Sequence, residues 1–352
     1  MKDSRLIKLA NLLVDYSANV QKEEHVLIQI DEFEAMPLAE ELFKKILAKG
    51  AYPIIRIRPD IFDYLLVNYG KENQIISFLD SAIYELKNVQ ARIRIVAPAN
   101  LRSMNNADPA KIALLEKKLS QRKYLHKIKW VTFYYPTEAL AQEMNMSLEE
   151  AEDFIFKVCL KDWPAEAKKM GKIKQIFDRG DEVCIKGDCT NIRFSIKGRK
   201  GRVSDGKHNM PGGEVYYAPI ENSTYGFIFF EGIRIFQNKE IKNISLEFED
   251  GEITEAKAET GGEFLESLIK TDKGSNRIGE FGIGTNYDVK KMTGEMLFDE
   301  KMGGTIHLAL GDNVSDGKNK SAIHLDLLKD LRSGGEIRLD DVLIQEGGKF
   351  LF

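Results

Sequence analysis

The sequence predicts an α/β N-terminal domain with a mainly parallel sheet, followed by a β-rich α+β C-terminal domain. The first half alternates short apolar runs, typical of buried strands, with helices of ten or more residues, which is the pattern of crossover units in a parallel sheet. Beyond Arg179, short alternating strands broken by glycine follow one another. The length, 352 residues, also exceeds what one compact core usually serves. We therefore expect domains over residues 1–177, ending in a helical linker, and 178–352.

Helical and strand-like segments take turns along the first half. Hydrophobic spacing predicts helices over residues 4–19, 35–50, 60–87 and 107–123, and strands over 25–30, 52–58, 91–98 and 127–136. Gly50 is placed to terminate the second of these helices. No GxGxxG motif follows the first strand, so the sequence favours a scaffold or substrate-wall domain over a nucleotide site.

The chain is expected to be helical from 137 to 170 and β-rich after that. Within the helical stretch, Ser147 followed by Glu150 fits a capping box. One further helix is predicted near 261–272, among the strands of the second domain.

Composition narrows the class of protein. Hydrophobic residues at 43% and charged residues at 30% are typical of a globular protein, and a net charge of −4 argues against general affinity for nucleic acid. There is no apolar run near eighteen residues, and the first twenty residues are charged and helix-periodic rather than a signal peptide. We therefore expect a cytoplasmic protein that binds neither membrane nor nucleic acid. Cys159, Cys184 and Cys189 are expected to be free thiols.

Two histidine-bearing segments near the C-terminus have the alternation of strands. In GTIHLALG, Thr305, His307 and Ala309 share one face, because strand side chains alternate. In AIHLDLL, His324 and Asp326 are two residues apart and project together. Imidazole and carboxylate suit zinc, cobalt or manganese. Two half-buried strands with solvated polar faces would have the same pattern, and the alternation leaves both interpretations open.

Two glycine-rich turns add carboxylates to this set. NMPGGEVYYAP delivers Glu214 at the start of a strand, and GEFGIGTN delivers Glu280 among three glycines. An ordinary turn and a β-bulge are the structural alternatives. Together the two histidines and three carboxylates suit a pair of divalent ions ~3.5–4 Å apart that bind and ionise a water.

Four motifs resemble, in order, those of the aminopeptidase T family of metallo-aminopeptidases: NMPGGEV, GEFGIGTN, EKMGGTIHLALG and KNKSAIHLD. The segment FYYPTEALAQEMNMSLEEAEDFIFKVC also resembles that family's linker between domains. The resemblance implies a C-terminal catalytic domain, a homodimer, and removal of N-terminal residues from peptides with two divalent ions, whether zinc, cobalt or manganese. It implies metal ligation by Glu214, Glu280, His307, His324 and Asp326, with Glu280 as the bridging group. A water between the two ions would lose its proton to Glu280 or Glu214, and Glu280 is the predicted catalytic residue.

One position departs from the family pattern. Where the family has a tyrosine that helps stabilise the oxyanion, this chain has Val314 in a slightly shorter loop. The departure keeps two alternatives open: another two-metal hydrolase acting on an amide or a phosphoester, and a non-catalytic metal-binding dimer. Tyr216, Tyr217 and Tyr287 are substitute donors to consider.

Glu300 lies beside the first histidine segment. We expect it to hold a ligating histidine through the second ring nitrogen, outside the ligand set itself. The alternative is a surface carboxylate paired with Lys301.

Overall fold

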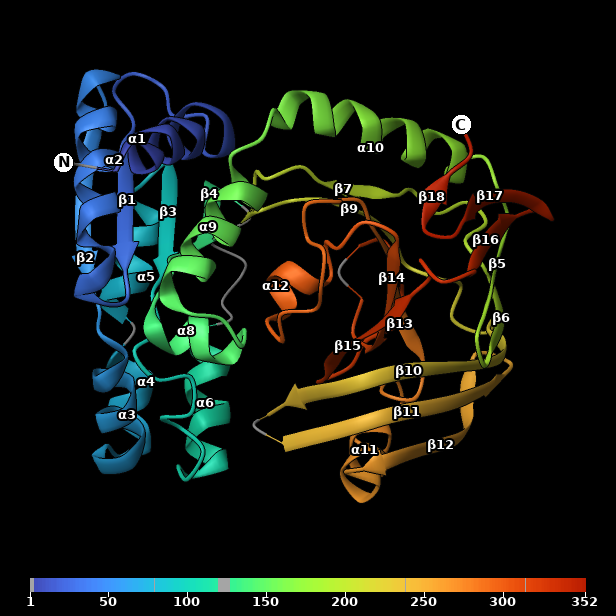
Figure 1. Cartoon of the computed structure of the whole chain (residues 1–352). Helices are drawn as coiled ribbons and strands as arrows, with labels where there is room; N and C mark the ends of the chain where they lie inside the picture. The colour runs from blue at the N-terminus through green and yellow to red at the C-terminus, as the bar shows by residue number, and fades with distance from the viewer. Residues whose placement is uncertain (1–2, 79, 120–126, 238, 314) are drawn as a thin grey trace. The chain divides into compact units, whose positions relative to one another are not determined.

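The structure is a computed structural model that describes residues 3–78, 80–119, 127–237, 239–313 and 315–352. The chain forms two compact units, one made of Met1–Lys161 with Gly206–Gly212 and the other of Asp162–Asp205 with Gly213–Phe352 (Figure 1). The first unit holds a parallel sheet and the second holds sheets of antiparallel strands, which confirms the predicted fold class. The domain boundary at residue 177 stays a prediction.

The first unit is built on a five-stranded sheet with the order β2-β1-β3-β4-β8. Its strands are β1 (His25–Ile30), β2 (Tyr52–Ile57), β3 (Ala91–Val96), β4 (Lys129–Tyr134) and β8 (Asn209–Met210). Every neighbouring pair is parallel. The last strand comes from the second half of the sequence and has only two residues, too short for periodicity to reveal. The chain moves outward from β1 to β2 and then returns to β3 on the other side of β1.

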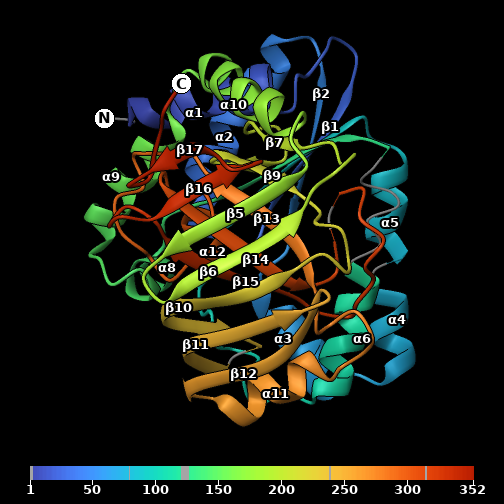
Figure 2. The ribbon, with the colours of Figure 1, turned by 90° about the vertical axis from the view of Figure 1, so that its right-hand side faces the viewer.

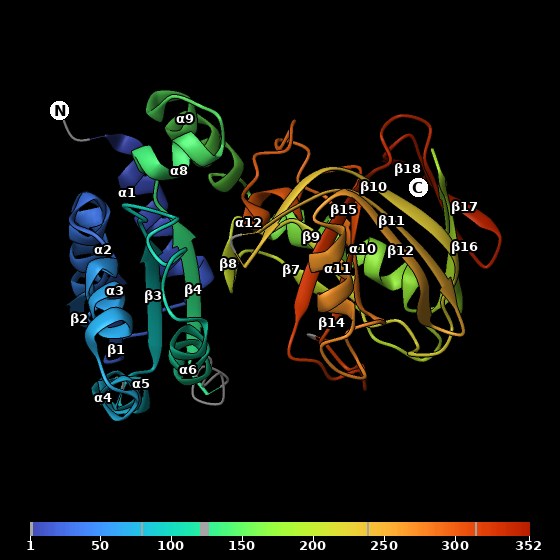
Figure 3. The ribbon, with the colours of Figure 1, turned by 90° about the horizontal axis from the view of Figure 1, so that it is seen from below.

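Helices surround this sheet. They are α1 (Ser4–Asn11), a π-helix (Leu12–Ser17), a 3-10 turn (Phe33–Ala35), α2 (Met36–Ala48), α3 (Asp60–Tyr69), α4 (Glu72–Phe78), α5 (Asp80–Lys87), α6 (Pro109–Leu119), α8 (Glu138–Glu143) and α9 (Leu148–Cys159). Helix α2 packs on β1 and β2 through buried Leu38 and Leu42 (Figure 3). The single helix expected over 60–87 is interrupted at Gly70, which has extended backbone angles. The capping box of Ser147 and Glu150 at α9 is confirmed.

The second unit begins with α10 (Trp163–Phe177) and contains two sheets. The larger has the order β12-β11-β10-β6-β5-β16-β17-β18 (Figure 2). Its strands are β5 (Glu182–Gly187), β6 (Thr190–Ser195), β10 (Tyr225–Phe236), β11 (Lys239–Glu249), β12 (Glu252–Thr260), β16 (Glu336–Leu339), β17 (Val342–Glu346) and β18 (Lys349–Phe350). The remaining helices are α11 (Gly262–Ile269) and α12 (Met296–Asp299).

The smaller sheet of this unit has the order β15-β14-β13-β9-β7. Its strands are β7 (Arg202–Ser204), β9 (Glu214–Tyr217), β13 (Ile278–Gly284), β14 (Thr305–Gly311) and β15 (His324–Asp330). Phe281 on β13 packs edge-on against Phe194 on β6, so the two sheets share one apolar core. Every residue of β13 and β14 is buried, which places both faces of these strands inside the unit.

Two expectations from composition concern thiols and membranes. Cys159, Cys184 and Cys189 are free thiols, as predicted. Among the described helices, none combines the length and the apolar character needed to span a bilayer.

Candidate metal centre

The predicted site residues gather on one face of the smaller sheet. In the strand register, Ala309 on β14 lies opposite both Glu280 and Asp326. His307 lies opposite Gly282, which in turn lies opposite Tyr216 on β9. Directly opposed residues in a sheet project to the same side. The alternation expected for β14 and β15 therefore places an imidazole between carboxylates from three neighbouring strands.

Short distances join these side chains into two groups. His307 Nε2 lies 3.3 Å from Glu280 Oε1 and 3.6 Å from Glu214 Oε2. His324 Nε2 lies 3.3 Å from Asp326 Oδ1, while its Nδ1 lies 2.8 Å from the carbonyl oxygen of Asp312. A ring held through Nδ1 presents Nε2 to a ligand, which is how metal-binding histidines are usually oriented.

Several buried oxygen and nitrogen atoms in this cluster, which could bind a metal ion, have no hydrogen-bond partner among the described residues. They are Glu214 Oε2, Glu280 Oε2 and His307 Nδ1. A buried polar atom left without a partner costs about 1–3 kcal/mol, so three in one place are expensive for a purely structural cluster. Oxygen and imidazole nitrogen atoms in this arrangement fit a divalent cation. Ligand atoms of Glu214, Glu300 and His307 also lie within 4.8 Å of one another, which adds Glu300 to the candidates.

Lys301, which the sequence suggested only as a surface partner of Glu300, is buried inside the cluster. The Lys301 ammonium is fully buried and lies 2.6 Å from Glu214 Oε1, and it also donates to Glu300. Both carboxylates raise the pKa of Lys301 against the opposing effect of burial. An adjacent Glu and Lys are common on surfaces, so only the fold reveals this buried pair. The role expected for Glu300, holding a histidine through its second nitrogen, stays a prediction.

Charge and burial act against each other on the histidines. Burial would lower the pKa of His307, but the hydrogen bond with Glu280 and the charges of Glu214 and Asp326 raise it to about 9. Burial likewise opposes the effect of Asp326 on His324, and the pKa of His324 still rises to about 10. Without a bound metal, both rings are therefore in the cationic imidazolium form near neutral pH. A metal ion must displace a proton from each ring nitrogen that it binds.

The pKa values of the carboxyl groups in the cluster shift in opposite directions. Burial is the largest effect on Glu280 and raises its pKa, and burial also raises the pKa of Glu300 to about 8. For Asp326 burial is again the largest single effect, but the charge of His324 outweighs it together with other cations, and the pKa falls to about 2. Asp326 is thus a permanent anion, while Glu280 sits where a proton can be taken up.

The substitute oxyanion donors differ in what their hydroxyl groups already contact. Val314 lies outside the described residues. Tyr217 donates to the carbonyl oxygen of Lys174 at 3.0 Å, and Tyr287 donates to that of Gly348 at 2.8 Å. The pKa of Tyr216 rises to about 12, first through burial and then through the charges of Glu214 and Glu280, which places this phenol among the site carboxylates.

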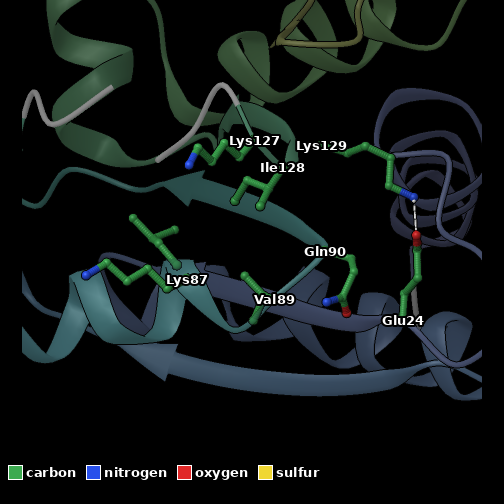
Figure 4. Close-up of a pocket in the computed structure, with 8 residues that line it drawn as sticks. Glu24, Lys87, Val89, Gln90, Lys127, Ile128 and Lys129 are labelled. Atoms are coloured by element: carbon green, nitrogen blue, oxygen red, sulfur yellow. Dashed lines mark hydrogen bonds and ion pairs between the residues drawn. The ribbon is translucent and has the colours of Figure 1, made fainter. Parts of the chain in front are cut away.

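A hollow lies in the first unit, at the amino ends of β3 and β4 (Figure 4). It measures about 680 Å³ and is lined in part by Lys87, Gln90 and Lys129. The Lys129 ammonium is already paired with Glu24 at 2.5 Å, and the Gln90 side-chain oxygen accepts from the His25 amide. Lys129 and Gln90 thus already have partners in the protein. The hollow is therefore a weaker candidate for binding a charged ligand than the cluster around His307.

Comparisons with known proteins identify the family of this chain. A sequence model of the family described as thermophilic metalloprotease (M29) matches residues 2–334. The chain belongs to this metalloprotease family. It is therefore a peptide-bond hydrolase, and the family implies a divalent metal. The predicted resemblance is confirmed.

Two related proteins match different shares of the chain. Aminopeptidase 2 of Geobacillus stearothermophilus is 23% identical over 92% of this chain and 88% of its own length. Aminopeptidase T of Thermus aquaticus is 27% identical over 36% of this chain and 35% of its own. The solved structure of wild-type AmpT from Thermus thermophilus superposes with a TM-score of 0.82 at 18% identity, covering 99% of both chains, so the two share a fold.

Proposed function

We propose that this metallopeptidase is an aminopeptidase that works with two divalent ions held by Glu214, Glu280, His307, His324 and Asp326. The observation that carries the proposal is the set of buried, unpartnered donor atoms on one face of the smaller sheet. The names of the related proteins, Aminopeptidase 2 and Aminopeptidase T, support the N-terminal specificity. Zinc, cobalt and manganese all suit these ligands.

The residues of the site divide the work of hydrolysis. Divalent ions, when bound, acidify a water molecule and polarise the scissile carbonyl. Glu280 is placed to accept the proton of the attacking water, because burial already favours its protonated form. The same carboxyl can then return the proton to the leaving amine. Lys301 places one positive charge between Glu214 and Glu300, which limits the negative charge that the site accumulates.

Partners and location belong to the same proposal. Peptides are the substrates, and a homodimer in the cytoplasm is the state we infer from the family resemblance. The net charge of −4 supports the absence of nucleic-acid binding. No membrane association is proposed.

Metal removal tests the proposal. Exhaustive dialysis against EDTA should abolish release of the first residue from a peptide, and added zinc, cobalt or manganese should restore it, since every proposed ligand is a nitrogen or oxygen donor. Metal analysis of the active preparation should give two ions per chain. His307→Ala should lose both metal and turnover. His208 directly precedes β8 in the other unit, so His208→Ala should keep both.

Each of the other outcomes supports a different function. Full activity after EDTA dialysis would exclude a metal mechanism. Hydrolysis of phosphoesters but not of aminoacyl-nitroanilides would indicate another two-metal hydrolase. Two ions per chain without any hydrolysis would indicate a metal-binding dimer.

A further inference from the structure

Lys301 is held at the metal centre by its backbone as well as by its charge. It lies two residues after α12, where its N–H donates to the Phe298 carbonyl oxygen at 3.1 Å, and its own carbonyl oxygen accepts from the Asn286 N–H at 2.8 Å. A Cβ atom built on Gly284, at the end of β13, would lie 3.1 Å from the Lys301 carbonyl carbon. The main chain at Lys301 is therefore fixed against the smaller sheet, and the start of its side chain is fixed as well.

The ammonium of Lys301 contacts a proposed ligand at the start of a strand. Glu214 begins β9 and lies opposite Gly284 in the strand register. Lys301 Nζ lies 2.6 Å from Glu214 Oε1, and it also donates to the Glu300 carboxylate. The lysine side chain has no exposed surface, and that of Glu214 is only 8% exposed. A charge-assisted hydrogen bond that water does not reach is short and directional, so it holds the Glu214 carboxylate in one orientation.

The two oxygens of Glu214 therefore differ in what they can still bind. Oε1 is occupied by Lys301, whereas Oε2 lies 3.6 Å from His307 Nε2 and accepts no hydrogen bond from the described residues. Glu280 has no such constraint. Its Oε1 lies 3.3 Å from the same ring nitrogen, its Oε2 has no partner, and no lysine or arginine of the described chain forms an ion pair with it. Glu280 thus keeps both oxygens available for cations, and Glu214 keeps one.

Charge alone does not explain a lysine in this place. An ammonium group 2.6 Å from a carboxylate ligand repels a divalent cation, so by its charge it weakens metal binding. Burial of an ion pair also has a desolvation cost, and an apolar pair of similar volume is often no less stable. A buried lysine at a cation site is therefore unfavourable unless its contact orients another group. The group that Lys301 orients is Glu214.

We propose that Lys301 is a positioning residue of the metal centre. By holding Glu214 at Oε1, it leaves this carboxylate one oxygen for a single cation, and it leaves Glu280 as the carboxylate that can span two. This role rests on the proposed function, since it takes Glu214 and Glu280 as metal ligands. It adds a residue outside the ligand set that decides how one ligand binds. Loss of a group that orients a metal ligand typically weakens metal binding by about 10–100-fold.

Zinc titration of the metal-free full chain against a chromophoric chelator tests this role, because it measures metal affinity rather than activity. Lys301→Met removes the ammonium and keeps a long side chain, and it should weaken zinc binding by about 10–100-fold. A lysine that acted by charge alone would give the opposite result, since loss of a positive charge favours a cation.

Lys329→Met is the matched control. Lys329 is also buried, but it projects from β15 on the face opposite Asp326, because the two are three residues apart. Its ammonium donates to the Asp188 carbonyl oxygen at 2.8 Å. Lys329→Met should therefore leave zinc affinity unchanged.

A double variant separates orientation from charge and from folding. Glu300→Gln with Lys301→Met keeps the net charge of the cluster and removes a buried pair rather than one member of it, which proteins tolerate better. It should still bind zinc about 10–100-fold more weakly than either the unaltered chain or Glu300→Gln. In a Glu214→Gln background, Lys301→Met should no longer weaken zinc binding, because the oriented carboxylate is absent. The Tm of each metal-free variant checks that it is folded.

The visible absorption of the cobalt-saturated chain tests the one-oxygen binding of Glu214. Cobalt(II) absorbs visible light more weakly as its coordination number rises. Lys301→Met frees the second oxygen of Glu214, so the absorption per bound ion should fall, whereas Lys329→Met should keep the spectrum of the unaltered chain. An unchanged spectrum in Lys301→Met would overturn this part of the proposal.

The outcomes distinguish the role of Lys301 from the proposed function. Zinc binding in Lys301→Met that equals or exceeds that of the unaltered chain would overturn the positioning role and leave the metallo-aminopeptidase in place. An equal loss of affinity in the Glu214→Gln background would also overturn it, since Lys301 would then act on another group. Lys301-dependent zinc binding without hydrolysis of any peptide would reject the proposed function and keep the role of Lys301.

Discussion

Of the three substitute tyrosines, Tyr216 is best placed to stabilise the oxyanion in this chain, which lacks the tyrosine that the family uses. Its neighbour Tyr217 and the more distant Tyr287 already donate to backbone carbonyl groups. Tyr216 shares its side of the sheet with Gly282 and His307, and the charges of Glu214 and Glu280 help to raise its pKa to about 12 after burial. A phenol that keeps its proton remains a donor throughout the working pH range.

Tyr216→Phe should lower kcat by about 10²-fold with little change in KM, because a donor to a developing oxyanion acts mainly in the transition state. Steady-state kinetics on an aminoacyl-nitroanilide measure this. Tyr287→Phe is the control, since its hydroxyl serves the Gly348 carbonyl, and it should keep normal kcat. Equal kinetics in Tyr216→Phe and the unaltered enzyme would remove Tyr216 from the mechanism.

A glycine on strand β13 leaves the space that the His307 ring occupies. A Cβ atom built on Gly282 would lie 2.0 Å from His307 Cε1 and 2.2 Å from its Nε2. Real Cβ contacts do not reach such distances, so the imidazole occupies the space that a side chain at 282 would fill. Gly282 therefore makes room for the side chain of a proposed ligand from the next strand, which is a more specific role than a flexible turn.

Gly282→Ala should displace the His307 ring and lower metal content and turnover together, by an amount comparable to His307→Ala. Metal analysis and peptide hydrolysis on the same preparation measure both. Gly171→Ala in α10 is the matched control, because nothing lies within 4 Å of its added Cβ. That variant should gain about 0.5–1 kcal/mol of stability, as alanine replaces glycine inside a helix. Normal metal content in Gly282→Ala would show that the ring can move without loss.

The stability of the whole molecule is tied to pH through the metal centre. In the metal-free chain, His307 and His324 have pKa values raised from 6.5 to about 9 and about 10, and burial raises that of Glu300 from 4.5 to about 8. Groups with a raised folded-state pKa stabilise fully below their unfolded pKa, and this contribution is lost as pH rises through the folded value. Asp326, lowered from 3.8 to about 2, stabilises above about pH 4 and loses this only toward pH 2.

The metal-free chain should therefore lose stability between pH 7 and 10, while the stabilisation by added metal should grow, because the cation no longer competes with ring protons. Scanning calorimetry from pH 6 to 10, with EDTA or with zinc, measures both trends. Metal-free His307→Ala, which lacks one of the titrating rings, should lose less over this range. A metal-free Tm that rises from pH 7 to 10 would contradict the charge arrangement described for the site.

The sequence by itself determined the elements and the identity of the candidate ligands. Strand alternation placed His307 with Ala309 and His324 with Asp326 on common faces, because a period of two follows from backbone geometry alone. The turns before Glu214 and Glu280 were equally local. The fold class followed from the alternation of strands and helices in the first half and from glycine-broken strands in the second.

Only the tertiary structure decided what depends on neighbours distant in the chain. The joining of β8 to a sheet formed by the first half and the burial of Lys301 between Glu214 and Glu300 cannot be read from local patterns. A lysine beside a glutamate, or an arginine in a strand, has the same sequence pattern whether solvent or protein surrounds it. Burial and pairing are properties of the packed chain, and they determine the charges that a cation would meet in the candidate site.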